Sequence, residues 1–372
     1  MKILHIGKFW PVRGGVEKVM YDLTLGLSRR GIRCDMLCAS TEGPALVIAL
    51  NDCGSVEATR TLCKASSTMI TPAMVTRLRR IAADYDIIHV HHPDPMAALA
   101  LLLSGFRGKV ILHWHSDILR QKVLLHFYKP LQRWLLRRAD LVICTSPKYA
   151  EGSAALRSVA AKLRCVPIGV ESVEPDPAAA AELGWTGRAR HIVFSMGRMI
   201  PYKGFENLIL AARDLPDDYL VVIAGSGPLY DRMQQLVDAN GLGAKVLLPG
   251  RISDRERDAL MAAASVFVLP SVEKTEAYGI VLIEAMSASL PVVATEIPGS
   301  GTSWVNAHGV SGLNVPVADP AALARAITDI CEDPDARAAY ARAARARWEE
   351  NFTAEHFLDT VTNIYRDLLA QS

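Results

Sequence analysis

The stretch SVFVLPSVEKTEAYGIVLIEAMSASLPVVATE, from Ser265 to Glu296, carries the pattern that decides the fold. It opens with a short apolar run of the kind that forms a buried β-strand, and it ends with a second such run, PVVATE. Between the two runs, a polar loop leads into the apolar segment IVLIEAM, which we expect to be a helix. A strand, a helix and a strand in this order predict a βαβ unit with parallel strands.

The same pattern recurs along all 372 residues. In the first half we expect strands at KILHIG, IRCDMLCA, DIIHVHH, KVILHWH, DLVICTS and LRCVPIG. In the second half we expect strands at HIVFSMG, YLVVIAG, KVLLPG, SVFVLPS and PVVATE. The chain is therefore predicted to be of the α/β class, and two open sheets, each doubly wound, fit its length.

The domain boundaries follow from composition. We expect one domain over residues 1–170 and a second over 191–352. Residues 171–190, rich in proline and alanine, predict a linker between them. Residues 353–372 predict a C-terminal helix that packs back on the first domain.

Charge is divided unevenly between the two halves. The net charge is +2 overall, but it is +12 over residues 1–170 and −10 over 171–372. A basic half suits nucleic acid, an anionic membrane surface or a phosphorylated acceptor. No recognisable nucleic-acid module is present in that half, so we expect no nucleic-acid partner.

The seven cysteines include no CxxC pair, and several lie within apolar strand patterns. This usage favours buried, reduced thiols in a cytosolic protein over zinc sites or disulfides. The chain has no apolar run of eighteen residues, and its first residues enter a strand pattern without the features of a signal peptide. We therefore expect a cytoplasmic protein, peripheral on the inner face of the membrane.

Open parallel sheets bind ligands beyond the carboxyl ends of their strands, so residues at strand ends are candidates for a site. GRMIPYKGF follows one strand and supplies Arg198 and Lys203, a planar fork and a point charge that suit a diphosphate. Gly225 in AGSGP follows the next strand, and Gly14 and Gly15 precede a helix whose amide groups could approach an anion. Taken singly, the glycine pair is more typical of a flexible turn and the two cations of a solvated basic loop, whereas AGSGP is equally typical of an ordinary tight turn.

Glu276 and Glu284 are separated by seven residues and flank the start of the helix near Gly279. Amide groups at that helix start could face a phosphate. Glu276 precedes the helix and Glu284 lies about two turns into it, so the two carboxylates would contact different parts of one ligand. Glu284 lies among apolar residues and needs hydroxyl or cationic partners, which ribose hydroxyls would supply.

With these motifs the chain resembles a retaining GT-B glycosyltransferase of the group 1 (GT-4-type) family over nearly its whole length. The resemblance implies two Rossmann-like domains facing across a cleft, with the acceptor on the first and the nucleotide sugar on the second. It implies that Arg198 and Lys203 bind the donor diphosphate, that Glu276 contacts the donor sugar and that Glu284 holds the ribose. It also implies that no metal is required.

The same resemblance implies which residues contact the nucleotide-sugar donor. LLPGRIS is similar to the family stretch whose backbone contacts the base of the nucleotide. The residues expected at the donor are Gly14, Gly15, Arg198, Lys203, Gly225, Arg251, Ile252, Glu276, Ala277, Tyr278, Gly279, Ile280 and Glu284. PGSGTSWV departs from the commoner Gly-Gly-x-x-Glu form, which leaves the donor contacts of that turn open.

The first half supplies HWHSDILRQK, in which His115 matches the family histidine that points at the reacting sugar. We therefore expect His115, Glu276, Arg198 and Lys203 to be catalytic. Asp117, Arg120 and Lys122 follow His115 and are expected on the acceptor side. Other histidines lie nearby at strand ends, so a metal cluster is an alternative to packing or lining the cleft. These neighbours are His89, His91, His92 and His113.

HSDILRQK and GTSWVNAHGVSGL look most like bacterial mannosyltransferases of surface polysaccharides. This implies GDP-mannose as the donor substrate and a polyprenyl-diphosphate-linked or other saccharide acceptor. The alternatives are a UDP-sugar donor, a sugar-nucleotide epimerase of the same fold, and a nucleotide-binding regulatory subunit. No enzymic nucleophile is evident, and the two glutamates hold the donor, so the glycosidase scheme does not fit. The resemblance implies front-face transfer with retention, in which the leaving phosphate oxygen helps to take the acceptor proton.

Residues 119–138 are basic and amphipathic, with apolar residues at helical spacing, and Pro130 predicts a division into two helices. A pair of core helices with a solvated charged face and a membrane-surface element both fit this pattern. The charge of the first half favours peripheral contact with an anionic membrane.

Overall fold

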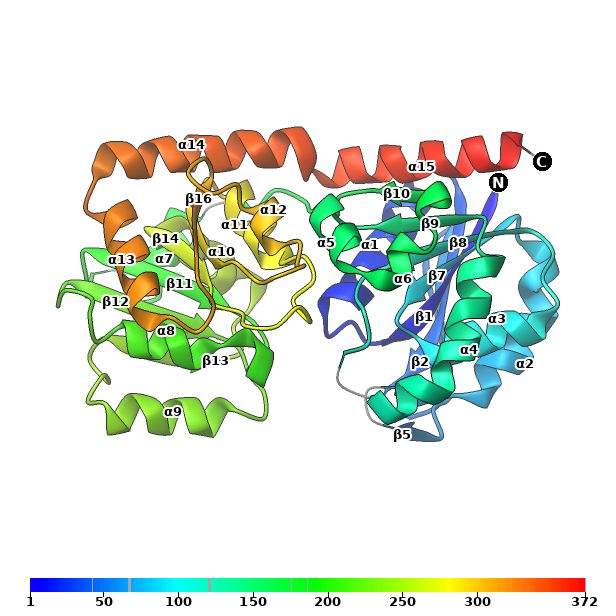
Figure 1. Ribbon diagram of the computed structural model, residues 1–372, viewed down its shortest axis with the longest axis horizontal. Helices are drawn as coiled ribbons and strands as arrows, with labels where there is room; N and C mark the ends of the chain where they lie inside the picture. Colours follow the sequence, from blue (N-terminus) through cyan, green and yellow to red (C-terminus); the bar gives the residue numbers. More distant parts are fainter. Residues whose placement is uncertain (42, 66–67, 120–121, 175, 186, 372) are drawn as a thin grey trace. The chain divides into compact units, whose positions relative to one another are not determined.

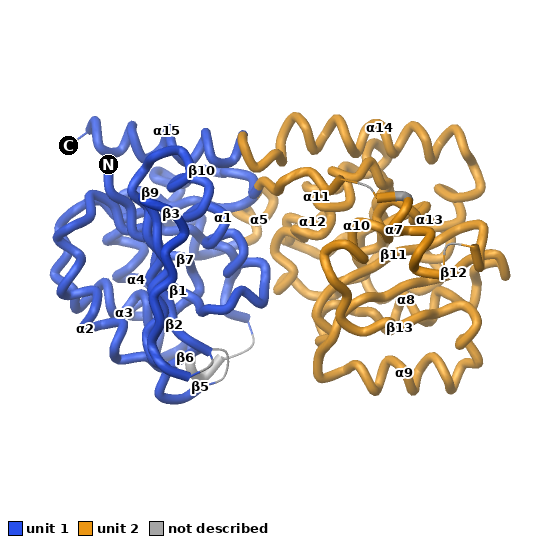
Figure 2. Tube along the Cα trace, turned by 180° about the vertical axis from the view of Figure 1, so that it is seen from behind, with its two compact units in different colours: residues 1–145, 153–168, 356–372 blue, residues 146–152, 169–355 orange. Residues whose placement is uncertain are grey.

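The computed structural model describes the chain except for residues 42, 66–67, 120–121, 175, 186 and 372 (Figure 1). The described residues form two compact units (Figure 2). Unit 1 contains residues 1–145, 153–168 and 356–372, and unit 2 contains residues 146–152 and 169–355. Unit 1 thus includes the last helix of the chain, and unit 2 includes a short segment that interrupts unit 1 in the sequence.

The sheet of unit 1 has eight strands in the order β10-β9-β8-β7-β1-β2-β4-β3. Its parallel strands are β1 (Lys2–Trp10), β2 (Arg33–Ser40), β4 (Gly54–Thr59), β7 (Ile87–His92), β8 (Lys109–Trp114), β9 (Leu141–Cys144) and β10 (Leu163–Cys165). The edge strand β3 (Leu46–Asn51) pairs antiparallel with β4. A separate hairpin joins β5 (Cys63–Ala65) to β6 (Thr68–Ile70).

The helices of unit 1 are α1 (Gly15–Arg29), α2 (Pro72–Ile81), α3 (Pro95–Ser104), α4 (Lys122–Arg138), α6 (Ala154–Arg157) and α15 (Ala354–Ala370). Short 3₁₀ turns cover Ala82–Asp84 and Ala160–Lys162. The C-terminal helix α15 packs on α1, because a Cβ at Gly26 would lie 2.6 Å from a methyl carbon of Leu358. Val361 and Tyr365 on α15 are fully buried.

The sheet of unit 2 has six parallel strands in the order β13-β12-β11-β14-β15-β16. The strands are β11 (His191–Met196), β12 (Tyr219–Ala224), β13 (Val246–Gly250), β14 (Val266–Leu269), β15 (Val292–Thr295) and β16 (Gly312–Val315). The helices are α5 (Pro147–Gly152), α7 (Pro177–Glu182), α8 (Phe205–Ala211), α9 (Tyr230–Ala239), α10 (Asp254–Ala263), α11 (Ile280–Ser287), α12 (Thr302–Val305), α13 (Pro320–Cys331) and α14 (Pro334–Asn351). The Val- and Ile-rich strands pack beneath α8 and α13 and form a buried apolar cluster of this unit.

Helices α7 and α4 occupy two of the segments singled out in the sequence. Residues 171–190 include α7, which packs its Ala179 and Ala180 against Ala259 of α10 in unit 2. Asp176 caps this helix by accepting a hydrogen bond from the Ala179 N–H, so part of the stretch rich in proline and alanine is helical.

The division at Pro130 is wrong, because α4 runs continuously from Lys122 to Arg138 with Pro130 inside it. Pro130 is exposed, so its ring faces solvent, while Leu135 and Leu136 hold the helix on the core. Among the described residues, no helix is both long and apolar enough to cross a bilayer.

Candidate active site

The loops that follow β11 and β12 are joined by backbone hydrogen bonds. The Gly197 N–H donates to the Ala224 carbonyl at 3.0 Å, and the Met199 N–H donates to the Ser226 carbonyl at 2.9 Å. Gly225 has φ of +142°, and a Cβ there would lie 1.9 Å from the Gly197 carbonyl oxygen. The close approach of the two loops therefore requires glycine at position 225.

The loop after β11 also meets the loop after β14. A 3₁₀ turn, Pro201–Lys203, ends at Gly204, which has φ of +64° and whose Cβ would lie 2.3 Å from the Pro270 carbonyl oxygen. The Val272 N–H donates to the Tyr202 carbonyl at 2.8 Å. These contacts bring the side chains of the two loops together.

At this junction the structure pairs two of the predicted catalytic residues. Lys203 Nζ lies 2.6 Å from Glu276 Oε2, and each side chain is 10% exposed. The Ser271 hydroxyl donates to the same carboxylate oxygen at 3.0 Å. Burial on its own would lower the pKa of Lys203, but Glu276, with Tyr202 and Glu284, outweighs burial and raises it. The lysine is therefore an ammonium group at neutral pH, held against a carboxylate.

The backbone around Glu276 is held by the turn that departs from the common family pattern. The Gly301 N–H donates to the Ala277 carbonyl at 2.8 Å, and the Ser300 hydroxyl donates to the Glu276 carbonyl. Ser300 is fully buried. The PGSG turn thus supports the glutamate through its main chain.

Helix α11 begins directly after this segment. Gly279 precedes it with φ of +83°, and Ile280 is its first residue. In the described part of the chain, no side chain caps the N-terminus of α11. Tyr278 is buried with its ring edge-on to Phe352 at 6.3 Å. The uncapped amide groups of α11 follow Glu276 in the chain by only a few residues.

Glu284 lies on α11 and is half-buried. Arg257 on α10 is a cationic neighbour that the sequence analysis missed. Burial would lower the pKa of Arg257, but Asp258 and Glu284 are among the groups that raise it. SDRER predicts the start of α10, but only the packing of α10 could place the guanidinium near α11.

Three further predicted donor residues of unit 2 are exposed or half-buried. Arg198 follows β11 and is exposed. Arg251 is exposed and Ile252 half-buried, and both follow Gly250, whose carbonyl accepts a hydrogen bond of 2.7 Å from the Gly225 N–H. The structure therefore joins the AGSG turn to the segment predicted to read the base, but it leaves the Arg198 side chain outside the buried ion pair.

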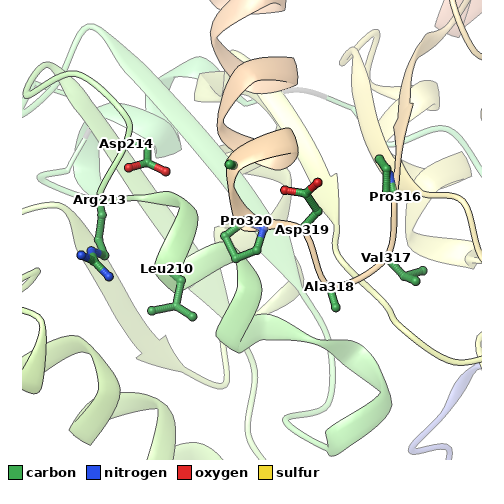
Figure 3. Close-up of a pocket in the computed structure, with 9 residues that line it drawn as sticks. Leu210, Arg213, Asp214, Pro316, Val317, Ala318, Asp319 and Pro320 are labelled. Atoms are coloured by element: carbon green, nitrogen blue, oxygen red, sulfur yellow. The ribbon is translucent and has the colours of Figure 1, made fainter.

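A surface hollow of about 630 Å³ in unit 2 lies elsewhere (Figure 3). It lies beside the start of α13 and is lined by Leu210, Arg213, Asp214, Pro316, Val317, Ala318, Asp319, Pro320 and Ala321. None of the predicted donor residues lines it. Asp319 caps α13 by accepting from the Ala322 N–H at 2.8 Å, so a carboxylate already occupies that helix N-terminus.

In unit 1 the predicted glycine pair stands at the start of α1. Gly14 is the extended residue before the helix, and Gly15 is its first residue. A Cβ at Gly14 would lie 2.6 Å from Glu17 Oε2, and Glu17 is buried. The N-terminus of α1 therefore already faces a carboxylate, and the phosphate contact expected there stays a prediction.

His115 follows β8 and is 5% exposed. It belongs to a histidine layer on one face of the unit 1 sheet, because His5 pairs with His89 across β1 and β7, and His91 pairs with His113 across β7 and β8. The members of this histidine layer are His5, His89, His91, His113 and His115. Neighbouring rings have centroids 4.1–5.4 Å apart, and all of these pairs are stacked except His5 with His91, which is tilted.

Every ring of the histidine layer is uncharged at neutral pH. Burial is the largest cause, and it lowers the pKa of His5 and of His113 to about 3. It lowers the pKa of His89, His91 and His115 well below the ordinary value, with further contributions from neighbouring histidines. His115 can therefore act as a neutral hydrogen-bonding group but not as an imidazolium.

Two histidine triads have ring nitrogens close enough to be considered for a metal ion. They are His5 with His89 and His91, and His91 with His113 and His115, with ligand atoms within 4.8 Å of one another. His91 belongs to both triads, and both of its ring nitrogens lie at hydrogen-bonding distance from other histidines. Ring nitrogens that are hydrogen-bonded to one another cannot all direct lone pairs at one ion. This geometry therefore favours a hydrogen-bonded arrangement over a metal site.

The predicted acceptor-side residues are distributed differently. Asp117 accepts hydrogen bonds from the Trp114 ring N–H at 3.0 Å and from the Ser153 hydroxyl at 2.7 Å, so its carboxylate ties the end of β8 to the start of α6. Arg120 lies outside the described residues, and Lys122 is the first residue of α4.

The chain matches two family models and two close relatives. The model described as Glycosyl transferases group 1 matches residues 187–347, and the model described as Glycosyltransferase Family 4 matches residues 13–173. The chain is 33% identical over 375 residues to the O-antigen chain mannosyltransferase C of Escherichia coli, covering 99% of both chains. It is 33% identical over 359 residues to the D-rhamnosyltransferase WbpZ of Pseudomonas aeruginosa, covering 95% of this chain and 93% of the relative.

Solved structures agree on the fold. The sucrose-phosphate synthase from Thermosynechococcus elongatus aligns over 100% of both chains with a TM-score of 0.82 at 23% identity. HepE from Anabaena, in complex with UDP, aligns over 99% of this chain and 100% of that chain with a TM-score of 0.80 at 22% identity. With both halves matched and two relatives at 33% identity, this chain belongs to the group 1 glycosyltransferases, with a family 4-type first half and the GT-B fold.

Proposed function

We propose that the enzyme transfers mannose from GDP-mannose to a polyprenyl-diphosphate-linked or other saccharide acceptor in surface-polysaccharide synthesis, with retention of configuration. The observation that carries this proposal is the buried ion pair of Lys203 and Glu276 on the strand-end loops of unit 2. The similarity to a mannosyltransferase of Escherichia coli over 99% of both chains supports mannose as the sugar.

The pair suits a departing diphosphate. An ammonium group has three N–H donors, so Lys203 can hold Glu276 and still donate to a phosphate oxygen. The uncapped N-terminus of α11 adds backbone donors and the positive end of a helix dipole. Arg198, exposed on the same loop as Lys203, can donate paired hydrogen bonds from its planar guanidinium group to the phosphate oxygens. These groups would stabilise the leaving diphosphate without a metal ion, so we propose a metal-independent reaction.

The two glutamates would fix the donor at both ends. Glu276 would accept hydrogen bonds from hydroxyls of the transferred sugar, and Glu284 from hydroxyls of the ribose. His115, uncharged, would hydrogen-bond the sugar from unit 1. With these carboxylates committed to positioning, the acceptor would attack on the face from which the phosphate leaves, and a phosphate oxygen would take the acceptor proton.

A second candidate sugar is D-rhamnose, because a D-rhamnosyltransferase is also 33% identical over most of the chain. A UDP-sugar donor is the third, since HepE, whose structure contains UDP, has the same fold. No observation favours an epimerase or a regulatory subunit.

A thermal-shift screen of GDP, UDP and their mannose, rhamnose and glucose conjugates tests the donor. A ligand at a hundredfold excess over its Kd should stabilise the protein by about 2.7 kcal/mol. The proposal requires the largest shift from GDP-mannose in the presence of EDTA. Larger shifts from uridine nucleotides, or a β-linked product in NMR of the reaction with a saccharide acceptor, would contradict it.

The proposed membrane contact lies on α3 and α4, which pack side by side. Phe127 is 76% exposed, and Leu102 and Leu103 are 41% and 49% exposed. Lys129 and Arg133 are also exposed on α4. Exposed apolar side chains and exposed cations on the same pair of helices suit an anionic bilayer surface, which would place the enzyme peripherally on the inner face of the membrane.

Vesicle flotation at low salt tests this surface. The enzyme should bind vesicles rich in phosphatidylglycerol more strongly than neutral ones. The change Phe127→Ser with Lys129→Gln should weaken binding by about fivefold or more, since each cation near the surface contributes about 1 kcal/mol. Val310→Ser, which removes an exposed apolar side chain from unit 2, should leave binding unchanged. Equal binding by both variants would refute the contact.

A further inference from the structure

Four of the buried groups beneath His115 form a hydrogen-bonded chain with it. His115 Nε2 lies 2.9 Å from His91 Nδ1, and His91 Nε2 lies 2.8 Å from His5 Nδ1. His5 Nε2 lies 3.4 Å from the Tyr365 hydroxyl, which lies 2.6 Å from His89 Nδ1. The chain therefore runs from the end of β8, through β7 and β1, to helix α15.

The rings of His115, His91 and His5 must share one tautomer. A neutral imidazole has one N–H donor and one acceptor nitrogen, and each hydrogen bond between two rings holds one proton. His115, His91 and His5 are connected in the same sense, Nε2 to Nδ1. Either all three carry the proton on Nδ1 or all three carry it on Nε2. The choice made at one end of the chain is therefore transmitted to the other.

The far end of the chain favours one of these two arrangements. Within the described residues, His89 Nε2 is buried and has no hydrogen-bond partner. A buried N–H without an acceptor is the rarer and costlier case, so His89 should keep a lone pair on Nε2 and a proton on Nδ1. His89 then donates to the Tyr365 oxygen, and the hydroxyl proton of Tyr365 is directed at His5 Nε2.

We propose that His91, His5 and Tyr365 are positioning residues that hold His115 in the Nδ1–H tautomer. With Nε2 accepting from His91, the ring presents Nδ1–H as a hydrogen-bond donor. Because Nε2 is engaged with His91, Nδ1 is the ring nitrogen of His115 that a ligand would contact. The importance of this donor for sugar transfer rests on the proposed function, in which His115 contacts the donor sugar.

The hydrogen-bonded chain of side chains orients His115, but it does not conduct protons. If a proton were passed along the hydrogen bonds from His115, it would have to bind to the last ring of the series or be released there. That end is His89, whose ring is fully buried, and burial opposes an imidazolium there. The role of the chain is thus to fix which nitrogen of His115 carries the hydrogen.

Ring-¹⁵N-histidine labelling of the full-length enzyme tests the proposal directly. Long-range ¹H–¹⁵N correlation spectra distinguish the two tautomers, and single His→Gln variants assign the rings. We expect Nδ1–H signals for His5, His91 and His115 in the enzyme without donor. An Nε2–H signal at His115, or different tautomers among the three rings, would overturn the proposal. So would movement of the His91 and His115 signals with one equivalent of Zn²⁺, because that would reveal a metal site.

Tyr365→Phe removes the hydroxyl proton that selects the tautomer. The intrinsic preference of imidazole for Nε2–H is then unopposed at His5, and a second tautomer should appear at His115. We expect kcat to fall roughly tenfold, as for loss of one hydrogen bond in the transition state, with little change in the donor KM. Val361→Ala is the matched control, because it removes buried methyl groups from the same helix and should lower Tm without changing the tautomer or kcat.

The two readouts separate this proposal from the proposed function. If Tyr365→Phe keeps both the single tautomer and the kcat of the wild type, the positioning role is wrong. If the wild-type enzyme transfers no sugar from any nucleotide donor, the proposed function fails, and the tautomer spectra still decide whether the chain sets the state of His115.

Discussion

Lys203 and Glu276 are each dependent on the other, because both charges are withdrawn from water. Removing one partner of a buried ion pair leaves an uncompensated charge, which destabilises a protein far more than loss of a surface pair. Their contact spans 73 positions of sequence and depends on the approach of Gly204 to Pro270. The residue types and strand ends predicted a ligand site, but no local pattern could show that these two side chains pair with each other.

Glu276→Gln should therefore affect both stability and activity. We expect the free energy of unfolding to fall by about 3 kcal/mol, because the buried ammonium of Lys203 loses its counter-charge. Sugar transfer should also fall at least tenfold in kcat, because the donor sugar loses a charged acceptor. Urea denaturation and initial rates measure these effects. Glu296→Gln, which breaks the exposed pair with Lys148, should change stability by less than about 1 kcal/mol. Near-normal turnover of Glu276→Gln would remove Glu276 from the site.

The histidine layer predicts a stability that depends on pH. Burial lowers the pKa of His5 and His113 to about 3, so the unfolded chain binds more protons than the folded chain between that value and the ordinary histidine range. Their contribution to stability is full above pH about 6.5 and is lost as pH falls, at about 1.4 kcal/mol per pH unit for each ring. Urea denaturation between pH 7 and pH 5 should show this steep fall.

His113→Leu tests this dependence at one ring. Neither ring nitrogen of His113 has a hydrogen-bond partner in the described chain, so an apolar side chain of similar size removes two buried unsatisfied atoms. The slope of stability against pH should decrease by about 1.4 kcal/mol per pH unit. The exposed His126→Gln should keep the wild-type slope. An unchanged slope in His113→Leu would show that this ring is charged when folded.

At the scale of elements, the sequence predicted the buried parallel strands but not those with mixed patterns. β3 has alternating half-buried and exposed residues, and β16 is only four residues long with Asn314 inside it. Such edge strands lack the continuous apolar run that marks the centre of a parallel sheet. Helix α7 was not predicted, because its alanines form no apolar pattern of their own and are buried only by packing on α10.

The loops of unit 2 predict a sharp effect at Gly225. In Gly225→Ala, the new Cβ would overlap the Gly197 carbonyl, so the loops after β11 and β12 would have to separate. We expect a loss of roughly 2 kcal/mol or more in unfolding free energy, together with weaker donor binding in calorimetry. Gly243→Ala, where a Cβ meets nothing within 4 Å, is the matched control and should be nearly neutral. Tight donor binding by Gly225→Ala would show that the loops need not touch.

At the scale of the whole molecule, the two units differ in how the chain builds them. Unit 2 is almost one continuous segment, whereas unit 1 takes its last helix from beyond unit 2. That helix, α15, buries Tyr365 against the histidine layer and Leu358 against α1. Sequence periodicity located a terminal helix, but a residue contact across 360 positions, such as His5 with Tyr365, has no local signal.

A chain ending at Glu355 should therefore keep unit 2 but lose a cooperative unit 1. Removal of α15 exposes the apolar face of α1 and leaves the histidine layer open to water. Hydrogen exchange should increase throughout β1, β7 and β8, while the strands of unit 2 keep their protection. A chain ending at Ala370 should exchange like the full-length protein. Equal protection of β1 in both truncated forms would show that α15 is dispensable for unit 1.

Because α15 lies near the end of the sequence, unit 1 cannot be completed until late in translation. A ribosome that has completed the sheet of unit 1 must still translate residues 169–355 of unit 2 before α15 emerges. At about 5–20 residues per second, this interval lasts on the order of ten to forty seconds. During that time the nascent first unit would display an uncovered face to the cytosol, and unit 2 could fold ahead of it. We therefore expect chaperones to engage the first-made half of this polypeptide for longer than the second.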